Sequence, residues 1–199
     1  MELRFTPDGI IDAYQHGVFP MADEFTGDID WYLPDPRAII PLDGFHVPRS
    51  LAKRIRQRAF EIHVDRDFEG VMRGCADRSE GSWISDEFVR IYTDLHRRGF
   101  AHSVEAWKDG QLVGGVYGVA IGGAFMAESK FHRETDASKV ALAALVRLLK
   151  ERGFTVLDVQ FATPHLLQFG AVEIPHALYS CMLRSAVDKA PRPLAAEET

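Results

Sequence analysis

Hydrophobic and polar positions alternate with a period of two over residues 101–107, which predicts a β-strand. Residues 112–121 are apolar and contain glycines, and residues 124–131 follow as a third predicted strand. Asp109-Gly110 and Gly122-Gly123 separate the stretches, and both pairs are typical of tight hairpin turns. The pattern therefore predicts an antiparallel meander of strands.

Helical periodicity surrounds this predicted meander. Apolar residues spaced three or four apart predict helices over 68–76 and 86–98, and again over 137–152 and 176–189. An apolar run at 155–161 predicts one more strand after the third of these helices. A meander combined with packed helices is typical of an α+β domain.

The first part of the chain is more irregular. Thr6 and Pro7 predict the start of a helix that ends near Gly17. The proline-rich stretch 31–37 then predicts an ordered loop that carries two aromatic side chains. A basic helix over 50–58 and a strand over 60–64 are expected to follow.

These features predict three parts of unequal size. Residues 1–65 form a small N-terminal subdomain that contains the basic helix, and this subdomain is expected to pack on the larger unit. Residues 66–190 form that larger domain, and residues 191–199 read as a flexible tail.

Composition excludes several classes of protein. Apolar residues make up 46% of the chain and 26% is charged, which is typical of a globular domain. No apolar run approaches the roughly 20 residues of a membrane span, and the first residues lack a signal-peptide pattern. The two cysteines, Cys75 and Cys181, lie far apart and suggest neither a disulfide framework nor a zinc site. A cytoplasmic protein without a metal or cofactor is expected.

The charge distribution leaves one region that could bind a polyanion. The net charge of −6 argues against nonspecific binding of nucleic acid over the whole surface. Within residues 49–60, however, there are several cations and no acid, including Lys53, Arg54, Arg56 and Arg58. This cluster is either a solvated helix face or a helix that contacts phosphates.

The clearest candidate for chemistry lies in the strand predicted at 155–161. Strand alternation places Asp158 and Gln160 on one face, so that the carboxylate can polarise and orient the carboxamide. The alternative is a polar sheet face in water. Neither a dinucleotide-binding nor a P-loop glycine motif is present, and the glycines of residues 114–123 favour strand bulges and a turn.

An ordered set of segments resembles the leucyl/phenylalanyl-tRNA–protein transferase family. The segments are AYQHGVFPM (13–21), WYLPDPRAII (31–40), GSWIS (81–85), HSVEAW (102–107), LVGGVYGVAIGGAFMAES (112–129), DASKVAL (136–142), LDVQF (157–161) and GAVEIP (170–175). The resemblance implies a GNAT-like acyltransferase domain behind a small N-terminal subdomain. It also implies transfer of leucine, with phenylalanine and methionine as further candidate donors, from aminoacyl-tRNA to proteins that begin with Arg or Lys, which marks them for N-end-rule degradation.

The same resemblance implies roles for particular residues. Asp158 and Gln160 match the catalytic pair, and the basic cluster matches the helix that contacts tRNA. The residues implied to bind substrate are Trp31, Tyr32 and Trp83 for the terminal adenosine, Val116 and Phe125 for the donor side chain, and Glu128 for an ammonium or a basic side chain. Lys130 stands where the family usually has a methionine of the donor pocket, so strand alternation predicts an ion pair with Glu128. A monomer is expected.

Two other functions remain open from the sequence. A CoA-dependent N-acetyltransferase could use the same fold, although such enzymes carry a glycine-rich pyrophosphate loop and residues 132–136 contain no glycine. A non-catalytic tRNA-binding module would need neither Asp158 nor Gln160.

Overall fold

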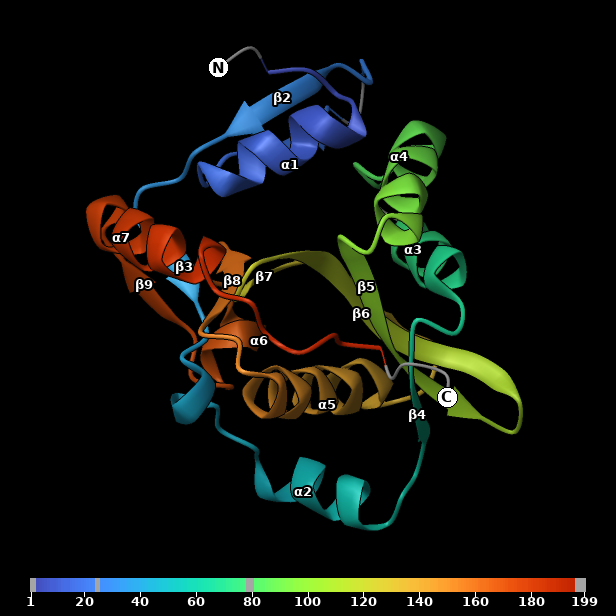
Figure 1. Cartoon of the computed structure of the whole chain (residues 1–199). Coiled ribbons are helices and arrows are strands. Elements are labelled where there is room, and N and C mark those ends of the chain that lie inside the picture. Colours follow the sequence, from blue (N-terminus) through green and yellow to red (C-terminus); the bar gives the residue numbers. More distant parts are fainter. Residues whose placement is uncertain (1–2, 24–25, 78–80, 196–199) are drawn as a thin grey trace.

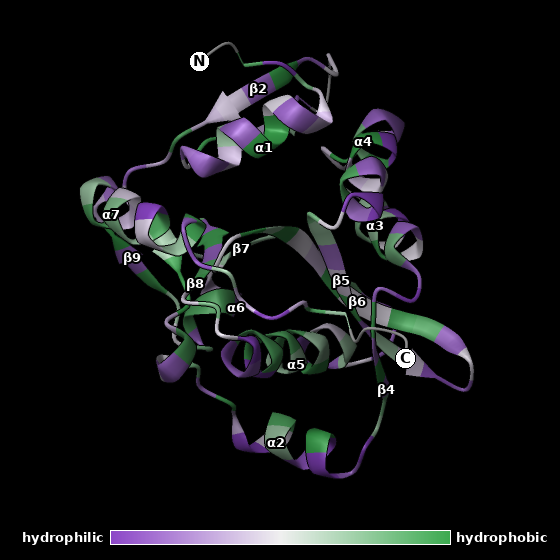
Figure 2. Ribbon diagram, in the orientation of Figure 1, coloured by the Kyte–Doolittle hydropathy of each residue, from purple (hydrophilic) through white to green (hydrophobic). Residues whose placement is uncertain are grey.

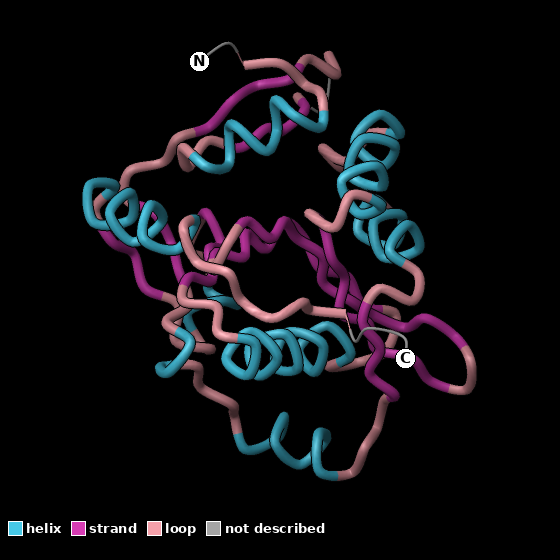
Figure 3. The backbone as a smooth tube through the Cα atoms, in the orientation of Figure 1, coloured by secondary structure: helices cyan, strands magenta, loops and turns pink. Residues whose placement is uncertain are grey.

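A computed structural model describes residues 3–23, 26–77 and 81–195, and it shows one seven-stranded sheet with helices on both faces (Figures 1 and 3). The strands lie in the order β4-β5-β6-β7-β8-β3-β9. Their bounds are β4 Glu61–Val64, β5 Ala101–Lys108, β6 Gln111–Ile121, β7 Ala124–His132, β8 Val156–Gln160, β3 Arg37–Ile39 and β9 Val172–Ile174. The mixed α and β composition agrees with the expected class.

The predicted meander is confirmed as strands β5, β6 and β7, which pair antiparallel in sequence order. Asp109 and Gly110 form the first turn with φ angles of 52° and 74°, the left-handed region that a two-residue hairpin requires. Strand β8 then pairs parallel to β7. That direction requires a crossover, and helix α5 (Ala137–Arg152) supplies it.

Two hydrophobic cores lie on opposite faces of the sheet. Helix α5 covers one face, and its apolar side, green in Figure 2, packs on Val116, Phe125 and Leu157. The other face is covered by α1 (Pro7–Gln15), α3 (Phe68–Ala76), α4 (Asp86–Arg97) and α7 (His176–Val187). Since polar side chains of β7 and β8 lie between these layers, the sheet can hold a site that is shielded from water.

The sequence missed four short strands. Strands β1 (Phe19–Ala22) and β2 (Ile29–Tyr32) form a separate two-stranded sheet, so Trp31 and Tyr32 lie on a strand rather than in the predicted loop. Strands β3 and β9 join the main sheet beside β8. A strand of three or four residues has too few positions to show alternation, and all of β3 is buried.

The segment before residue 65 contributes to both ends of the main sheet order. Strand β4 lies at one edge, and β3 lies between β8 and β9. The division of the chain at residue 65 stays a prediction. Helix α2 (Arg49–Arg56) packs beneath α5, and it ends before Arg58, whose φ of 49° is left-handed. Across the part of the chain that the structure describes, no helix has both the length and the apolar character to cross a bilayer.

Candidate active site

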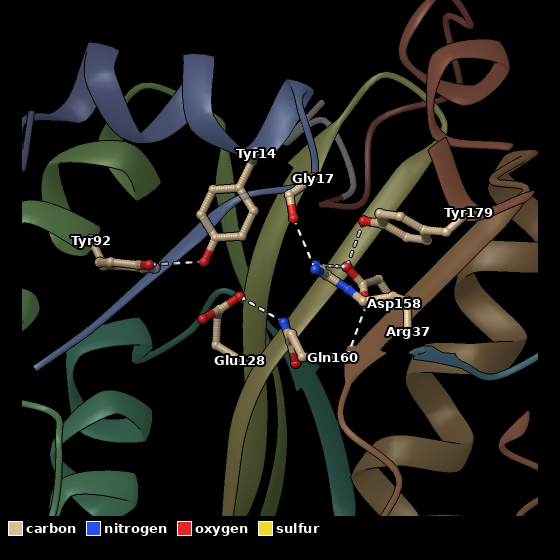
Figure 4. Close-up of polar contacts among 8 residues, drawn as sticks. All are labelled: Tyr14, Gly17, Arg37, Tyr92, Glu128, Asp158, Gln160 and Tyr179. Atoms are coloured by element: carbon tan, nitrogen blue, oxygen red, sulfur yellow. Dashed lines mark hydrogen bonds and ion pairs between the residues drawn. The ribbon is translucent and has the colours of Figure 1, made fainter. Parts of the chain in front are cut away.

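A fully buried ion pair lies under the end of strand β8. Asp158 Oδ1 accepts a hydrogen bond from Arg37 Nε at 2.9 Å, and Asp158 Oδ2 accepts one from Arg37 Nη2 at 2.6 Å (Figure 4). The Tyr179 hydroxyl of α7 donates to Oδ2 at 2.7 Å. Arg37 Nη1 also donates to the carbonyl of Gly17 at 2.8 Å. The pair therefore ties β3, β8, α7 and the end of α1 together.

Aromatic rings complete the surroundings of Arg37. Its guanidinium carbon lies 4.8 Å from the ring centre of Phe19 and 4.6 Å from that of Tyr179. Burial lowers the pKa of Arg37, but the Asp158 carboxylate more than offsets this effect and leaves the pKa above its usual value. Both charges are thus retained in the interior, where each depends on the other.

Gln160 does not follow the expected strand alternation. Its φ of 58° is left-handed, so the side chain turns away from the direction that β8 would give it. Asp158 Oδ1 accepts from the backbone amide of Gln160 at 2.9 Å, whereas Gln160 Nε2 donates to Glu128 Oε1 at 3.1 Å. The expectation that Asp158 orients the carboxamide directly is wrong, because Glu128 takes that position. The idea of a solvated polar face is also wrong, since Asp158 and Gln160 are both buried.

Glu128 occupies an irregular position in strand β7. Tyr117 pairs with Ser129 and Gly118 pairs with Ala127, so Glu128 is the extra residue of a β-bulge. Burial raises the pKa of Glu128 to about 8, and the nearby Asp158 raises it further, while the Tyr14 hydroxyl and Arg37 act in the opposite direction. The Tyr14 hydroxyl also lies 2.9 Å from that of Tyr92. Glu128 therefore gains and loses a proton close to neutral pH.

Glu128 and Gln160 reach the wall of an open cavity of about 400 Å³, which we call the transfer cavity. Its other lining residues are Phe19, Met21, Trp83, Ser129, Lys130, Val159, Phe161, Thr163 and Leu166. A smaller recess of about 70 Å³ lies next to it and shares the residues Glu128, Lys130 and Gln160. A polar wall that meets an aromatic and aliphatic cavity is suited to hold an amine beside an apolar group.

The structure brings several predicted residues together here and leaves others apart. Trp83, Glu128, Lys130 and Gln160 share the transfer cavity, and Val116 lines the recess. Phe125 lies instead in the core beneath α5, where its side chain is 1% exposed. Asp158 does not line either space.

The two predicted aromatic residues of strand β2 face different surroundings. Tyr32 is exposed and its ring stacks on Phe19, with 5.8 Å between the ring centres. Because Phe19 lines the transfer cavity, Tyr32 extends that aromatic wall outward. Trp31 packs instead against the core on the α1 side of the sheet. Their opposite directions follow from the alternation of a strand.

The basic cluster lies on and just after α2, away from the residues of the transfer cavity. Lys53, Arg56 and Arg58 are exposed, and Arg54 is half-buried against Phe60. Arg54 Nη2 approaches the carbonyl of Thr135 at 3.4 Å, just before α5. For the described residues, no group of three or more His, Cys, Asp or Glu side chains is placed to hold a metal ion.

Sequence reasoning missed Arg37, Tyr179, Tyr14 and Phe19 as parts of this site. Each comes from a segment distant in sequence from Asp158, so no local spacing connects them. The one local signal was Arg37 itself, a charged residue directly before the apolar run 38–40. A charge in that position is either exposed at a strand end or paired in the interior.

Comparison with known proteins shows the family. The family model described as leucyl/phenylalanyl-tRNA protein transferase matches residues 39–184, and the model of its N-terminal domain matches residues 4–35. Two curated relatives carry the name leucyl/phenylalanyl-tRNA–protein transferase. The protein of Salinibacter ruber is 50% identical over 94% of this chain and 82% of its own length, and that of Herpetosiphon aurantiacus is 53% identical over 94% and 97%.

These matches define the class of protein as a transferase that uses aminoacyl-tRNA. The chain belongs to the leucyl/phenylalanyl-tRNA–protein transferase family. A solved structure of L-PGS from Bacillus licheniformis is more remote, with 13% identity, a TM-score of 0.46, and coverage of 78% of this chain and 66% of that one. That likeness is too low to support an argument.

Proposed function

We propose that this enzyme transfers leucine, and with lower efficiency phenylalanine, from aminoacyl-tRNA to the N-terminal Arg or Lys of acceptor proteins, which marks them for N-end-rule degradation. Membership of the family gives the reaction. The observation that supports this site is the Gln160 carboxamide, which donates to Glu128 at the wall of the transfer cavity.

The reaction is an aminolysis of an activated ester. The α-amine of the acceptor attacks the carbonyl carbon of the aminoacyl ester, the new amide bond forms, and the ribose oxygen of the terminal adenosine leaves with a proton. Gln160 Nε2 is engaged with Glu128, so Gln160 Oε1 is the atom that can accept a hydrogen bond from the attacking amine. Such a contact orients the nitrogen lone pair toward the carbonyl.

Glu128 is the group suited to take the proton that the amine loses. Its pKa of about 8 lies close to the reference value of about 8 for an α-amine, so proton exchange between them is nearly balanced. Asp158 serves a different purpose. Its two oxygens already accept from Arg37, Tyr179 and the Gln160 amide, so we assign it as a positioning residue rather than a base.

The donor is held by the remaining walls. Trp83 and the Phe19–Tyr32 stack offer aromatic faces for the terminal adenine, a contact worth about 1–3 kcal/mol per base. Val116 in the recess and Leu166 beside it offer apolar contact to the donor side chain. The α2 cations would contact phosphates of the tRNA body. A GNAT-like domain, a monomeric state and a cytoplasmic location belong to the same proposal.

A transfer assay separates this function from its alternatives. Radiolabelled Leu-tRNA and acetyl-CoA are each incubated with matched peptides that begin with Arg or with Ser. We expect label only on the Arg peptide and only from Leu-tRNA. Label from acetyl-CoA would favour an N-acetyltransferase, and bound tRNA without any product would favour a non-catalytic module.

A further inference from the structure

A second cavity of about 400 Å³ lies beside the transfer cavity and shares Lys130 with it. Its cation-bearing side chains are those of Lys130, His132, Lys139 and His165, and we call it the cationic cavity. Thr135, Asp136 and Ser138 complete the lining. The function proposed above uses none of its residues except Lys130.

The single acid of this lining is already paired. Asp136 Oδ1 lies 2.8 Å from Lys139 Nζ, and the other nearby acid, Glu134, lies 3.2 Å from Lys108 instead. The lining therefore contains two lysines and two histidines against one acid, so its cationic groups and proton donors outnumber its carboxylates. The pKa of His165 is lowered mainly by burial, and the nearby charges of Lys130, Lys139 and His132 lower it further.

Two further features favour an anion. The Nδ1 atom of His165 is shielded from solvent and has no hydrogen-bond partner among the described residues. Helix α5 begins at this wall, and its N-cap Asp136 makes no side-chain capping bond, since its carboxylate is turned toward Lys139. The amides of a first helical turn that lacks a side-chain cap attract negative charge.

We propose that the cationic cavity binds a phosphodiester of the single-stranded 3′ end of the donor RNA. The inference rests on the proposed function for the identity of the ligand. The terminal adenosine would lie in the transfer cavity, and the chain would pass Lys130 so that the preceding phosphate meets Lys139 and His165. Arg54 lies 3.4 Å from the carbonyl of Thr135, so the path could continue from the cationic cavity toward the basic cluster on α2.

The proposal also explains what Lys130 does in place of the methionine that the family usually carries there. Its stem lines the transfer cavity and the recess, whereas its charge acts on His165 in the cationic cavity. A long side chain of this kind can give apolar contact along its stem and place its ammonium in a polar space. One residue would thus contact both the aminoacyl group and the RNA backbone.

Binding of the trinucleotide CpCpA and of adenosine, measured by titration calorimetry at low salt, tests the site. The variants are Lys139→Gln and His165→Gln, and Lys139→Arg serves as the charge-preserving rescue. Lys108→Gln is the matched control, because Lys108 is also paired with an acid but lies outside the cavity. The wild type should bind CpCpA more tightly than adenosine. Lys139→Gln should weaken CpCpA roughly 10-fold with adenosine unchanged, as expected for a lost hydrogen bond to a charged group.

Salt dependence gives a second readout. Loss of one phosphate contact should lower the slope of log K against log salt by about 0.7 for Lys139→Gln, and Lys139→Arg should restore it. Unchanged CpCpA affinity in both Lys139→Gln and His165→Gln would overturn the proposal, as would an equal loss for adenosine and CpCpA. A wild type that binds CpCpA in this way but transfers no leucine would support the cavity and refute the proposed function.

Discussion

Two carboxylates, Asp158 and Glu128, lie on neighbouring strands of one sheet, but their surroundings differ. Asp158 is fully buried and is surrounded by Arg37, Tyr179 and the Gln160 amide. Glu128 lies at the wall of an open cavity, has a pKa of about 8, and interacts with the Gln160 carboxamide and the Tyr14 hydroxyl. One carboxylate is saturated with donors and the other is not.

This difference suggests that Asp158 has a structural role and Glu128 a chemical one. A carboxylate whose acceptor positions are filled fixes the backbone around it. A half-buried carboxylate whose pKa burial has raised to about 8 can exchange a proton with a substrate. Gln160 joins the two, since Asp158 holds its backbone and Glu128 holds its side chain.

The largest effect should come from breaking the buried cluster. Asp158→Ala leaves Arg37 as an uncompensated buried charge, which should lower the free energy of unfolding by about 3–5 kcal/mol in denaturant titrations. Asp43→Ala is the matched control, because Asp43 forms an exposed pair with Lys150, and we expect no measurable change. If Asp158→Ala slowed transfer at wild-type stability, Asp158 would belong to the chemistry instead.

Gln160→Ala removes the carboxamide that contacts Glu128 and should leave the Arg37–Asp158 ion pair intact. We expect single-turnover transfer to fall by roughly 10²–10³-fold, which is typical for the loss of one well-placed polar contact in a transition state. The affinity for tRNA and the stability should change little. Gln111→Ala, an exposed residue next to the Asp109-Gly110 turn, is the control. Unaltered transfer by Gln160→Ala would remove the carboxamide from the mechanism.

Lys130→Met tests whether the lining of the transfer cavity also determines which donor amino acid is used. The Lys130 side chain lines the transfer cavity, and we expect it to narrow the space for the donor, so the wild type should favour leucine over the bulkier phenylalanine. The variant should raise the ratio of kcat/KM for Phe-tRNA to that for Leu-tRNA by roughly 10-fold. Lys108→Met controls for the loss of a surface charge. An unchanged ratio would mean that the Lys130 side chain does not contact the donor. The predicted ion pair with Glu128 would then have no part in the choice of donor.

The last prediction concerns the protonation of Glu128. The pKa is raised in the folded state, so protonated Glu128 contributes stability that is lost as the pH rises through about 8. Glu128→Gln removes this titration, and its stability relative to the wild type should therefore increase between about pH 5 and about pH 9. Glu61→Gln, at an exposed position, should show no such trend. Parallel curves for wild type and Glu128→Gln would mean that Glu128 titrates normally.

The long elements could be predicted from the sequence because their periodicity extends over many residues. The β5–β7 meander, the turn at Asp109-Gly110 and helix α5 all show this. The short strands β3 and β9 could not be predicted in this way. Their pairing with β8 is determined by packing between distant segments, and burial on both sides erases the alternation of β3.

The site was predicted in its residues more completely than in its contacts. The resemblance to the family identified Gln160, Glu128 and Trp83, and these residues line one cavity. The partner of the Gln160 carboxamide could not be predicted, because the bulge at Glu128 and the left-handed φ at Gln160 both break the period of two. The alternation of side chains along a strand fails where the backbone is irregular. In this site the irregular positions are those that bring the polar groups together.

The position of β3 has a consequence for the newly made chain. Ala38 pairs with Gln160 on one side and with Glu173 on the other, so β3 can pair fully only after β8 and β9 have been synthesised. During synthesis the meander can form from local contacts, but Arg37 has no carboxylate to meet until Asp158 has been made, and one edge of β3 stays open until β9 has been made. Pairing over such sequence distances is slow, and an open edge invites association with other chains. A nascent chain that stops before Asp158 therefore cannot form the buried ion pair, and one that stops before β9 still exposes an edge of the main sheet.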